Sequence, residues 1–413
     1  MPVFIQTDVM DSLPLQRIEA TFSTMVTAAT APLEISGVPL VATDDPENRP
    51  TLVGADRARL AQVVWDLGEP PFRVKQLWHW IYHRGVQSFD EMTNISKDVR
   101  AKLADGYTLV RPAPAQTLKS IDGTCKWLLR FQDAGEAETV FIPEEDRGTL
   151  CISSQIGCTL NCRFCYTGTQ AWVRNLDAAE IVGQLMLARD FVDDWPSANE
   201  DRDITNIVMM GMGEPLYNYE NVARAVGIMV DGDGISISRR KLTLSTAGVV
   251  PMMKRCGEEL GVNLAVSLHA VTNDLRDEIV PLNRKYPIDE LVDACRNYGG
   301  ISNARRITFE YVMLKEVNDS DADARELIRL LNGIPAKINL IPFNSWPGAP
   351  YECATQDRIR SFMTICLDGG LTCTVRTPRG RDILAACGQL KSASERQRAS
   401  ARVHSAPLRQ IGR

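Results

Sequence analysis

Residues 149–166 carry the stretch TLCISSQIGCTLNCRFCY, in which apolar and small side chains lead into three cysteines. The run Leu150–Ser153 predicts a β-strand. The cysteines that follow it are Cys158, Cys162 and Cys165. In βα folds the loops at the C-terminal ends of the strands carry the chemistry. The stretch therefore predicts the first strand of an α/β fold with its functional groups on the next loop.

Further strand-like runs follow this loop, separated by connections long enough for helices. Such spacing predicts a parallel sheet of right-handed βα units. The count favours an open or partial (β/α)6 barrel, over residues 148–390, rather than a closed eight-fold one. Cys373–Arg376 can add an edge strand. The other predicted barrel strands are Asn206–Met210, Lys241–Ser245, Asn263–Leu268, Arg306–Leu314 and Lys337–Pro342.

Upstream, residues 51–110 predict a small helical domain. Apolar residues recur at helical spacing from Asp56 until Gly68 stops the run. A second helix is predicted over Phe72–His83, and a third over Ser96–Leu103 with Ser96 as its N-cap.

In residues 111–147 the spacing of apolar residues changes from the helical period towards a period of two. This pattern predicts a β-hairpin adaptor. Lys126–Phe131 and Ala137–Ile142 flank a five-residue turn that contains Gly135. The fold class predicted from the whole chain is thus α/β, with a helical domain and a hairpin before the partial barrel.

The composition is that of a globular protein without a membrane span or a signal peptide. The 413 residues are 44% apolar and 24% charged, which is typical of two or three globular units. The chain has no run of eighteen apolar residues and no signal-peptide pattern, so we expect a cytoplasmic protein. In a reducing compartment its eleven cysteines are expected to be ligands, nucleophiles or core residues.

The net charge of −6 argues only weakly against a nucleic-acid partner, because the charge is unevenly distributed. Residues 1–50 have a net charge of −5 and are predicted to be a flexible extension. Residues 391–413 have a net charge of +5, and this basic tail is either a solvated terminus or a polyanion contact.

The cysteine triplet has the C-x3-C-x2-C spacing. A closed zinc site needs four ligands, whereas the chain has four histidines in all and no further Cys or His within fifteen residues downstream. An iron–sulfur cube held by three thiolates leaves one iron open for a ligand. Together with Phe164 before the third cysteine, the spacing resembles the radical S-adenosylmethionine (SAM) superfamily, with zinc as the alternative.

That resemblance implies a [4Fe-4S] cluster whose open iron is chelated by SAM. Gly213 and Glu214 follow a predicted strand, where glycine lets the backbone approach a ligand and the carboxylate can accept from an amine. Other residues at strand ends can bind the ribose, carboxylate or adenine of SAM, although each type is also common as a cap. These residues are Ser245, Ser267, Leu268, His269 and Asn344.

Six longer runs extend the match beyond the superfamily. They are Val208–Pro215, Leu242–Thr246, Ser267–Ala270, Ile338–Pro342, Pro347–Tyr351 and Ala385–Leu390. With these runs, residues 55–390 resemble the RlmN family of radical SAM RNA methyltransferases. The resemblance implies methylation of adenine C2 in 23S ribosomal RNA, at the peptidyl transferase centre, and of adenine 37 in transfer RNA. It also implies an electron donor such as flavodoxin, and a monomer is expected.

The same resemblance implies three catalytic residues and two SAM molecules per turnover. Cys387 matches a carrier that becomes S-methylcysteine, and a 5′-deoxyadenosyl radical then removes a hydrogen atom from its S-methyl group. Cys151 matches the thiol that resolves the RNA adduct by forming a disulfide with Cys387. Glu138 matches the general base for the C2 proton. Without the resemblance to the family, we would interpret Cys151 as a buried core cysteine and Glu138 as an exposed residue of a strand.

Two points stay open in the sequence. Tyr166 is bulkier than the small residue expected after the cluster, which concerns substrate packing. RNA contacts are predicted at Arg73, Lys75 and Arg84, while Trp78 and Tyr82 are expected to pack inward. The rival functions are a C8-adenine methyltransferase of the antibiotic-resistance type, another radical SAM enzyme and a zinc-stabilised RNA-binding module. Arg376, Arg379 and Arg381 can line the RNA path near Cys387.

Overall fold

The computed structural model describes residues 33–34, 49–197 and 202–394, all within one compact unit that starts at Leu33. Most of the predicted acidic extension and most of the basic tail lie outside these residues. Within the predicted extension, Leu33–Glu34 form the short strand β1, which pairs with β2 (Ala113–Lys119).

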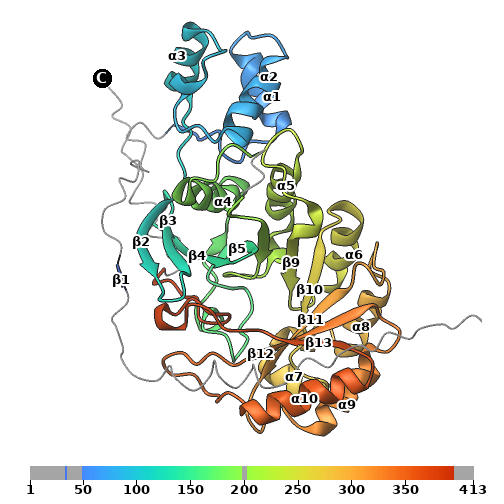
Figure 1. The fold of residues 1–413 in the computed structure, drawn as a ribbon. Helices are drawn as coiled ribbons and strands as arrows, with labels where there is room; N and C mark the ends of the chain where they lie inside the picture. Colours follow the sequence, from blue (N-terminus) through green and yellow to red (C-terminus); the bar gives the residue numbers. More distant parts are fainter. Residues whose placement is uncertain (1–32, 35–48, 198–201, 395–413) are drawn as a thin grey trace, which may run out of the picture. The chain divides into compact units, whose positions relative to one another are not determined.

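One sheet of eleven strands runs through the described residues in the order β1-β2-β3-β4-β5-β8-β9-β10-β11-β12-β13 (Figure 1). From β5 onwards neighbouring strands are parallel, which confirms the α/β class and the open barrel. The predicted edge strand is present as β13. The parallel strands are β5 (Arg147–Cys151), β8 (Asn206–Met209), β9 (Leu242–Thr246), β10 (Asn263–Ser267), β11 (Ile307–Met313), β12 (Ala336–Pro342) and β13 (Thr372–Val375).

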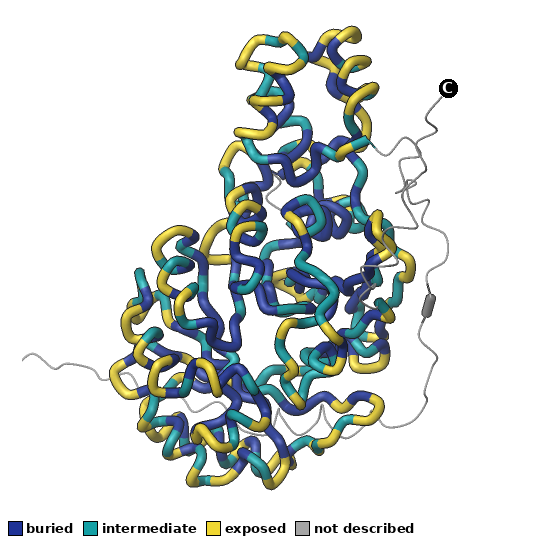
Figure 2. The backbone as a smooth tube through the Cα atoms, turned by 180° about the vertical axis from the view of Figure 1, so that it is seen from behind, coloured by how far each residue is buried: buried dark blue, intermediate teal, exposed yellow. Residues whose placement is uncertain are grey.

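Helices follow the parallel strands, and the buried residues lie mainly between the helices and the sheet (Figure 2). The helix after β5 begins at a capping box, in which Asp177 accepts from the backbone of Glu180 and Glu180 accepts in return. These helices are α4 (Ala178–Val192), α5 (Tyr219–Val230), α6 (Val250–Glu259), α7 (Asn273–Ile279), α8 (Ile288–Arg296), α9 (Asp321–Leu331) and α10 (Gln356–Asp368).

The predicted hairpin is confirmed as β3 (Cys125–Arg130) and β4 (Glu136–Glu144). The sequence did not predict β2, which pairs with β3 and makes the adaptor a meander. Strand β4 pairs antiparallel with β5, with Val140 opposite Cys151. The adaptor is therefore continuous with the barrel sheet and lies beside its first strand.

The helical region contains α1 (Arg57–Asp66), which is capped by Asp56, and α3 (Lys97–Gly106). The predicted second helix over Phe72–His83 is present, but it is not α-helical throughout, because α2 (Arg73–Trp78) passes into a π-helical turn over His79–His83. Ser96 precedes α3, but its side chain makes no cap hydrogen bond.

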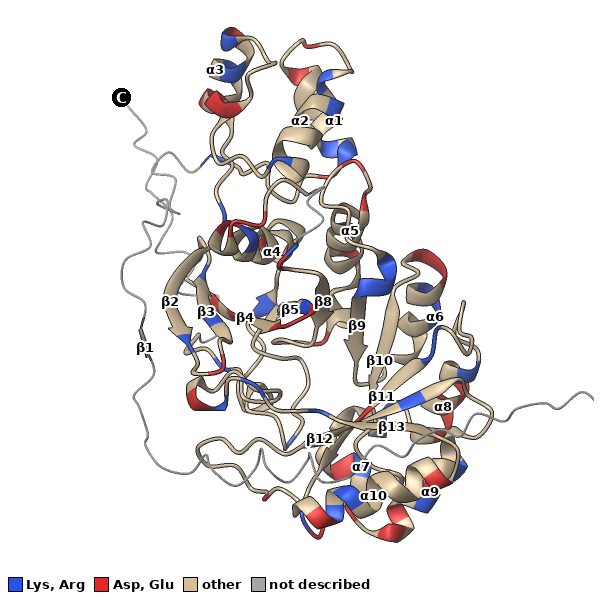
Figure 3. Cartoon of the chain, in the orientation of Figure 1, with Lys and Arg blue, Asp and Glu red and all other residues tan. Residues whose placement is uncertain are grey.

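The expected inward packing of this region is confirmed, since Trp78 and Tyr82 are 2% and 0% exposed. Arg73 forms an ion pair with Glu69 inside the same region. Figure 3 shows both Lys/Arg and Asp/Glu residues in the region of α1 to α3. No helix among the described residues is both long enough and apolar enough to cross a membrane.

Candidate active site

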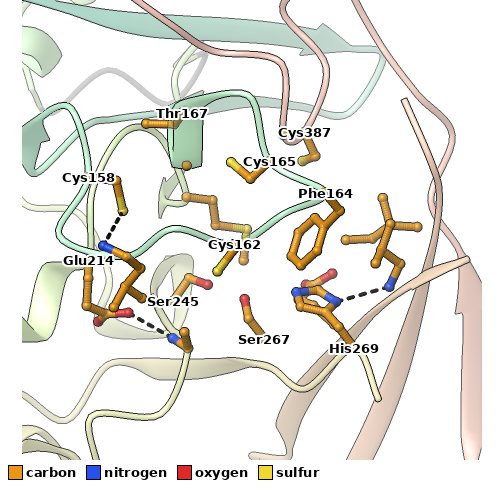
Figure 4. A pocket seen from close by; sticks show the side chains of 18 of the residues that line it. Cys158, Cys162, Phe164, Cys165, Thr167, Glu214, Ser245, Ser267, His269 and Cys387 are labelled. Atoms are coloured by element: carbon orange, nitrogen blue, oxygen red, sulfur yellow. Dashed lines mark hydrogen bonds between the residues drawn. The ribbon is translucent and has the colours of Figure 1, made fainter. Parts of the chain in front are cut away.

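A cavity opens where β8 to β12 end, and most of the predicted site residues line it (Figure 4). Leu268 is fully buried behind it, and Glu138 and Cys151 lie elsewhere. The predicted residues that line it are Cys158, Cys162, Cys165, Gly213, Glu214, Ser245, Ser267, His269, Asn344 and Cys387.

The cysteine loop is tightly folded around its own backbone. The Cys165 N–H donates to the Cys162 carbonyl at 3.1 Å. At Gly168 a Cβ atom would lie 2.4 Å from that carbonyl oxygen, so only glycine fits there. Burial raises the pKa of the Cys158 thiol to about 12 and also raises the pKa of the Cys162 thiol well above its ordinary value. Such thiols become thiolates when a metal replaces the proton.

The spacing of these thiols matters for the kind of metal centre. In the described part of the chain, no group of three or more His, Cys, Asp or Glu side chains is arranged around a single metal ion. The ligands of a cuboidal cluster bind different irons and so lie farther apart than the ligands of one ion. Three cysteines that line one cavity fit such a cluster.

Glu214 presents a buried carboxylate beside the loop. Its two oxygens accept from the N–H groups of Ala247 at 2.8 Å and Leu216 at 3.0 Å. Burial raises the pKa of Glu214 to about 7, although these two hydrogen bonds lower it in part. The preceding Gly213 has φ +99°, and a side chain there would collide with Gln155. This turn can therefore offer a carboxylate to a cationic amine.

His269 provides a fixed donor on the opposite wall. Its Nδ1 accepts from the Val312 N–H at 3.1 Å, and burial lowers the pKa of the ring to about 3. The neutral ring therefore carries its proton on Nε2. Ser245 and Ser267 line the same cavity, and their hydroxyls make no hydrogen bond within the described residues. These groups remain available to a polar ligand.

Arg276 of α7 is a residue that the sequence gave no reason to select. It is fully buried and donates to the carbonyls of Leu268, Ser267 and Ala247, which join the ends of β9 and β10. No carboxylate of the described chain forms an ion pair with it, and burial lowers the pKa of the guanidinium to about 10. The negative charge of the Cys162 sulfur opposes this lowering.

We expect Arg276→Met to lower the free energy of unfolding by about 3 kcal/mol, because methionine leaves these buried carbonyls without donors. Urea denaturation followed by circular dichroism measures the change. The matched control is Arg255→Met, which removes an arginine paired with Glu220 and Glu259 on the exposed surface. Equal stability of the two variants would contradict the role given to Arg276.

A second cavity adjoins the first and contains Cys151. Cys387, Asn344 and Arg376 line both cavities. Burial raises the pKa of the Cys151 thiol to about 12, and its charge interacts with that of Cys387. Both cysteines are free thiols. Cys387 therefore lies between the cysteine loop on one side and Cys151 on the other.

The residues Leu384–Lys391, here called the Cys387 segment, dock against the cysteine loop. The Tyr166 N–H donates to the Gly388 carbonyl at 2.7 Å, and Asn344 donates its amide to the Cys387 carbonyl at 3.1 Å. The bulky Tyr166 ring stacks on Trp346, with 4.8 Å between centroids. Tyr166 lines neither cavity and instead packs this segment.

Glu138 lies behind the Cys387 segment rather than on either cavity. Its carboxylate forms an ion pair with Lys126 at 2.8 Å and accepts from the Lys391 N–H at 2.8 Å. Burial raises the pKa of Glu138, while the Lys126 ammonium opposes the rise. Lys126 is a second residue that the sequence did not single out.

Arg376 follows β13, lines both cavities with Cys387 and supplies a positive charge that favours the Cys387 thiolate. The charges of Cys387 and Glu310 both raise the pKa of this guanidinium. Glu310 is buried on β11 and accepts from the Asn339 amide at 2.7 Å. Arg381, another predicted RNA contact, donates to Asn344 at 3.0 Å instead of standing free.

Comparison with known proteins gives matches along most of the chain. The model of the ribosomal RNA large subunit methyltransferase N-terminal domain matches residues 51–109, and that of the radical SAM superfamily matches residues 152–328. A dual-specificity RNA methyltransferase RlmN from Rhodospirillum rubrum is 62% identical over 358 residues, covering 86% of this chain and 83% of the relative. Its counterpart from Gluconobacter oxydans is 61% identical, covering 86% and 88%.

A solved structure gives the same result. The crystal structure of a radical SAM methyltransferase from Sphaerobacter thermophilus superposes with a TM-score of 0.77 at 44% sequence identity. The match covers 83% of this chain and 99% of that one.

Proposed function

The chain belongs to the RlmN family of radical SAM RNA methyltransferases, and on that premise we propose that it methylates C2 of one adenine in 23S rRNA and of adenine 37 in tRNA. The observation that carries the proposal is the position of Cys387, which lines both the cavity of the cysteine triplet and the cavity of Cys151. A group held on the Cys387 sulfur can be formed on one side and released on the other.

The radical SAM family uses a [4Fe-4S] cluster and SAM, and the residues of the first cavity fit both groups. We assign Cys158, Cys162 and Cys165 as cluster ligands, which leaves one iron for SAM. Glu214 would accept from the amino group of SAM, and the Nε2–H of His269 would donate to an acceptor atom of SAM. When bound, these groups supply the methyl group and the hydrogen-abstracting, one-electron chemistry.

A carrier is needed because C2 of adenine is an electrophilic amidine carbon, which cannot itself attack the methyl group of SAM. A cysteine thiolate can, so Cys387 is assigned as the nucleophile that becomes S-methylcysteine. The Arg376 guanidinium favours this thiolate, although burial raises the pKa of the Cys387 thiol overall.

Release of the product is assigned to Cys151. Its thiolate attacks the sulfur of Cys387, so that an S–S bond forms and the bond from sulfur to the methylene carbon breaks. The electron pair of that bond stays with the carbon, which takes up a proton to complete the methyl group, and the methylated RNA leaves while the two cysteines are joined in a disulfide. The interaction between the charges of these two thiols and their shared cavity support the assignment. Glu138 is assigned as the base for the C2 proton, and its raised pKa suits a proton acceptor.

The test is mass spectrometry of nucleosides from cells that lack this protein. Wild type should restore 2-methyladenosine in ribosomal or transfer RNA, Cys387→Ala should not, and Cys353→Ala, a half-buried cysteine outside both cavities, should behave as wild type. The appearance of 8-methyladenosine would overturn the regiochemistry. The absence of both nucleosides would overturn the RNA substrate.

A further inference from the structure

The Cys387 segment is attached to the hairpin by one pair of charged side chains. The Lys126 ammonium donates to the Leu384 carbonyl at 3.1 Å, and the Glu138 carboxylate accepts from the Lys391 N–H at 2.8 Å. Lys126 and Glu138 are joined to each other at 2.8 Å. One ion pair thus holds the segment on both sides of Cys387.

The hairpin register explains why these two side chains meet. Lys126 lies opposite Val140 and Glu138 opposite Leu128, so Lys126 and Glu138 are diagonal neighbours on one face of β3 and β4. They are 7% and 5% exposed. The bonded carbonyl belongs to Leu384, which has φ +52°, a left-handed conformation that is costly for a residue other than glycine. The bond from Lys126 therefore holds a strained turn.

A buried ion pair is stable only while both partners are charged, because removing one charge leaves the other unpaired. Protonation of Glu138 would leave the Lys126 ammonium with only the Leu384 carbonyl. It would also replace the charged acceptor of the Lys391 N–H by a neutral one, which forms a weaker hydrogen bond. Both attachments of the segment to the hairpin thus depend on the charge of one carboxylate, whereas its hydrogen bonds to Tyr166 and Asn344 do not.

We infer that Lys126 is a positioning residue that fixes the Cys387 segment to the hairpin together with Glu138, and that the proton taken from adenine releases the segment from the hairpin. The inference rests on the proposed function, which supplies that proton. The C2–H bond breaks, its electron pair stays in the ring, and an O–H bond forms on Glu138. Cys387 then becomes free to approach Cys151 only after the proton has left the nucleotide.

Hydrogen–deuterium exchange of the full-length, cluster-reconstituted protein tests the attachment. Lys126→Met and Glu138→Gln should each accelerate exchange in the Cys387 segment by about 10-fold, since each removes a charged hydrogen-bond partner. The matched control is Arg130→Met on the same strand, where Arg130 is exposed and pairs with Glu136. This control should leave exchange in the segment unchanged.

A double variant separates an ion-pair attachment from a general structural defect. The Lys126→Met, Glu138→Gln chain leaves no unpaired buried charge, so its segment should exchange no faster than in either single variant. Lys126→Arg, which keeps the charge, should recover most of the protection. Additive effects in the double variant, or unchanged exchange in both single variants, would overturn the inference.

The exchange measurement needs no turnover, which separates the inference from the proposed function. If wild type makes 2-methyladenosine but the single variants exchange normally, the attachment is wrong and the proposed function stands. If wild type makes no methylated adenine, the release step loses its proton source and is overturned together with the proposed function.

Discussion

Replacing Cys151 by alanine is expected to trap RNA on the protein as a covalent adduct. The change leaves Cys387, the cysteine triplet and Glu138 in place, so every proposed step up to bond formation with the RNA can proceed. The alanine variant lacks the thiol that shares the second cavity with Cys387 and that would release the product. Denaturing gels of reactions with labelled RNA should show a protein–RNA band that wild type does not accumulate.

Cys125→Ala is the matched control for this experiment. Cys125 lies on β3 of the same sheet and is 4% exposed, close to the 7% of Cys151, but it lines neither cavity. We expect it to turn over as wild type does. Ordinary turnover by Cys151→Ala would remove Cys151 from the mechanism, and an adduct in both variants would assign the effect to lost packing.

Replacing Cys162 by alanine should abolish cluster assembly. Cys162 is the middle cysteine of the loop, and its backbone carbonyl is enclosed by Gly168 and accepts from Cys165. A neighbouring side chain cannot replace its sulfur without refolding this loop. Iron and sulfide analysis after anaerobic reconstitution, together with visible absorbance, measures the loss.

Cys256→Ala controls for the removal of a buried thiol. Cys256 is fully buried in α6 and donates no group to either cavity. This variant should retain iron, sulfide and brown absorbance. An intact cluster in Cys162→Ala would refute the ligand assignment, and a content of about one zinc without sulfide in wild type would favour the zinc alternative.

The parallel half of the sheet can be predicted from sequence because its strands are short apolar-rich runs between helix-length connections. In β9 (Leu242–Thr246) buried and partly exposed residues alternate, whereas all but one residue of β11 (Ile307–Met313) is buried and its run of strand-forming residues is interrupted only by Glu310 near the middle. Strand β2 could not be predicted in the same way. Its register shifts between Pro114 and Gln116, and this irregularity removes the alternation of period two. The π-helical turn after Trp78 keeps a helical apolar pattern and leaves no separate signal.

The residues of the candidate site also differ in whether they can be predicted from the sequence. The cysteine triplet, Glu214 and His269 are visible in sequence, because each lies in a motif that follows a predicted strand. The role of Lys126 can be recognised only in the structure, from the hairpin register and from its hydrogen bond to the Leu384 carbonyl. Arg276 resembles an exposed helical arginine in sequence, and only the folded chain brings three carbonyls to its side chain.

The bond from Lys126 to Leu384 joins residues that are 258 positions apart, whereas the hairpin that carries Lys126 closes locally. The entropic cost of closing a loop grows only slowly with its length, so at equilibrium this long-range contact is only slightly less favourable than the same contact across a shorter loop. Contacts of such large sequence separation nevertheless slow folding. We therefore expect the Cys387 segment to join the protein late in folding, after the hairpin and the cysteine loop have formed.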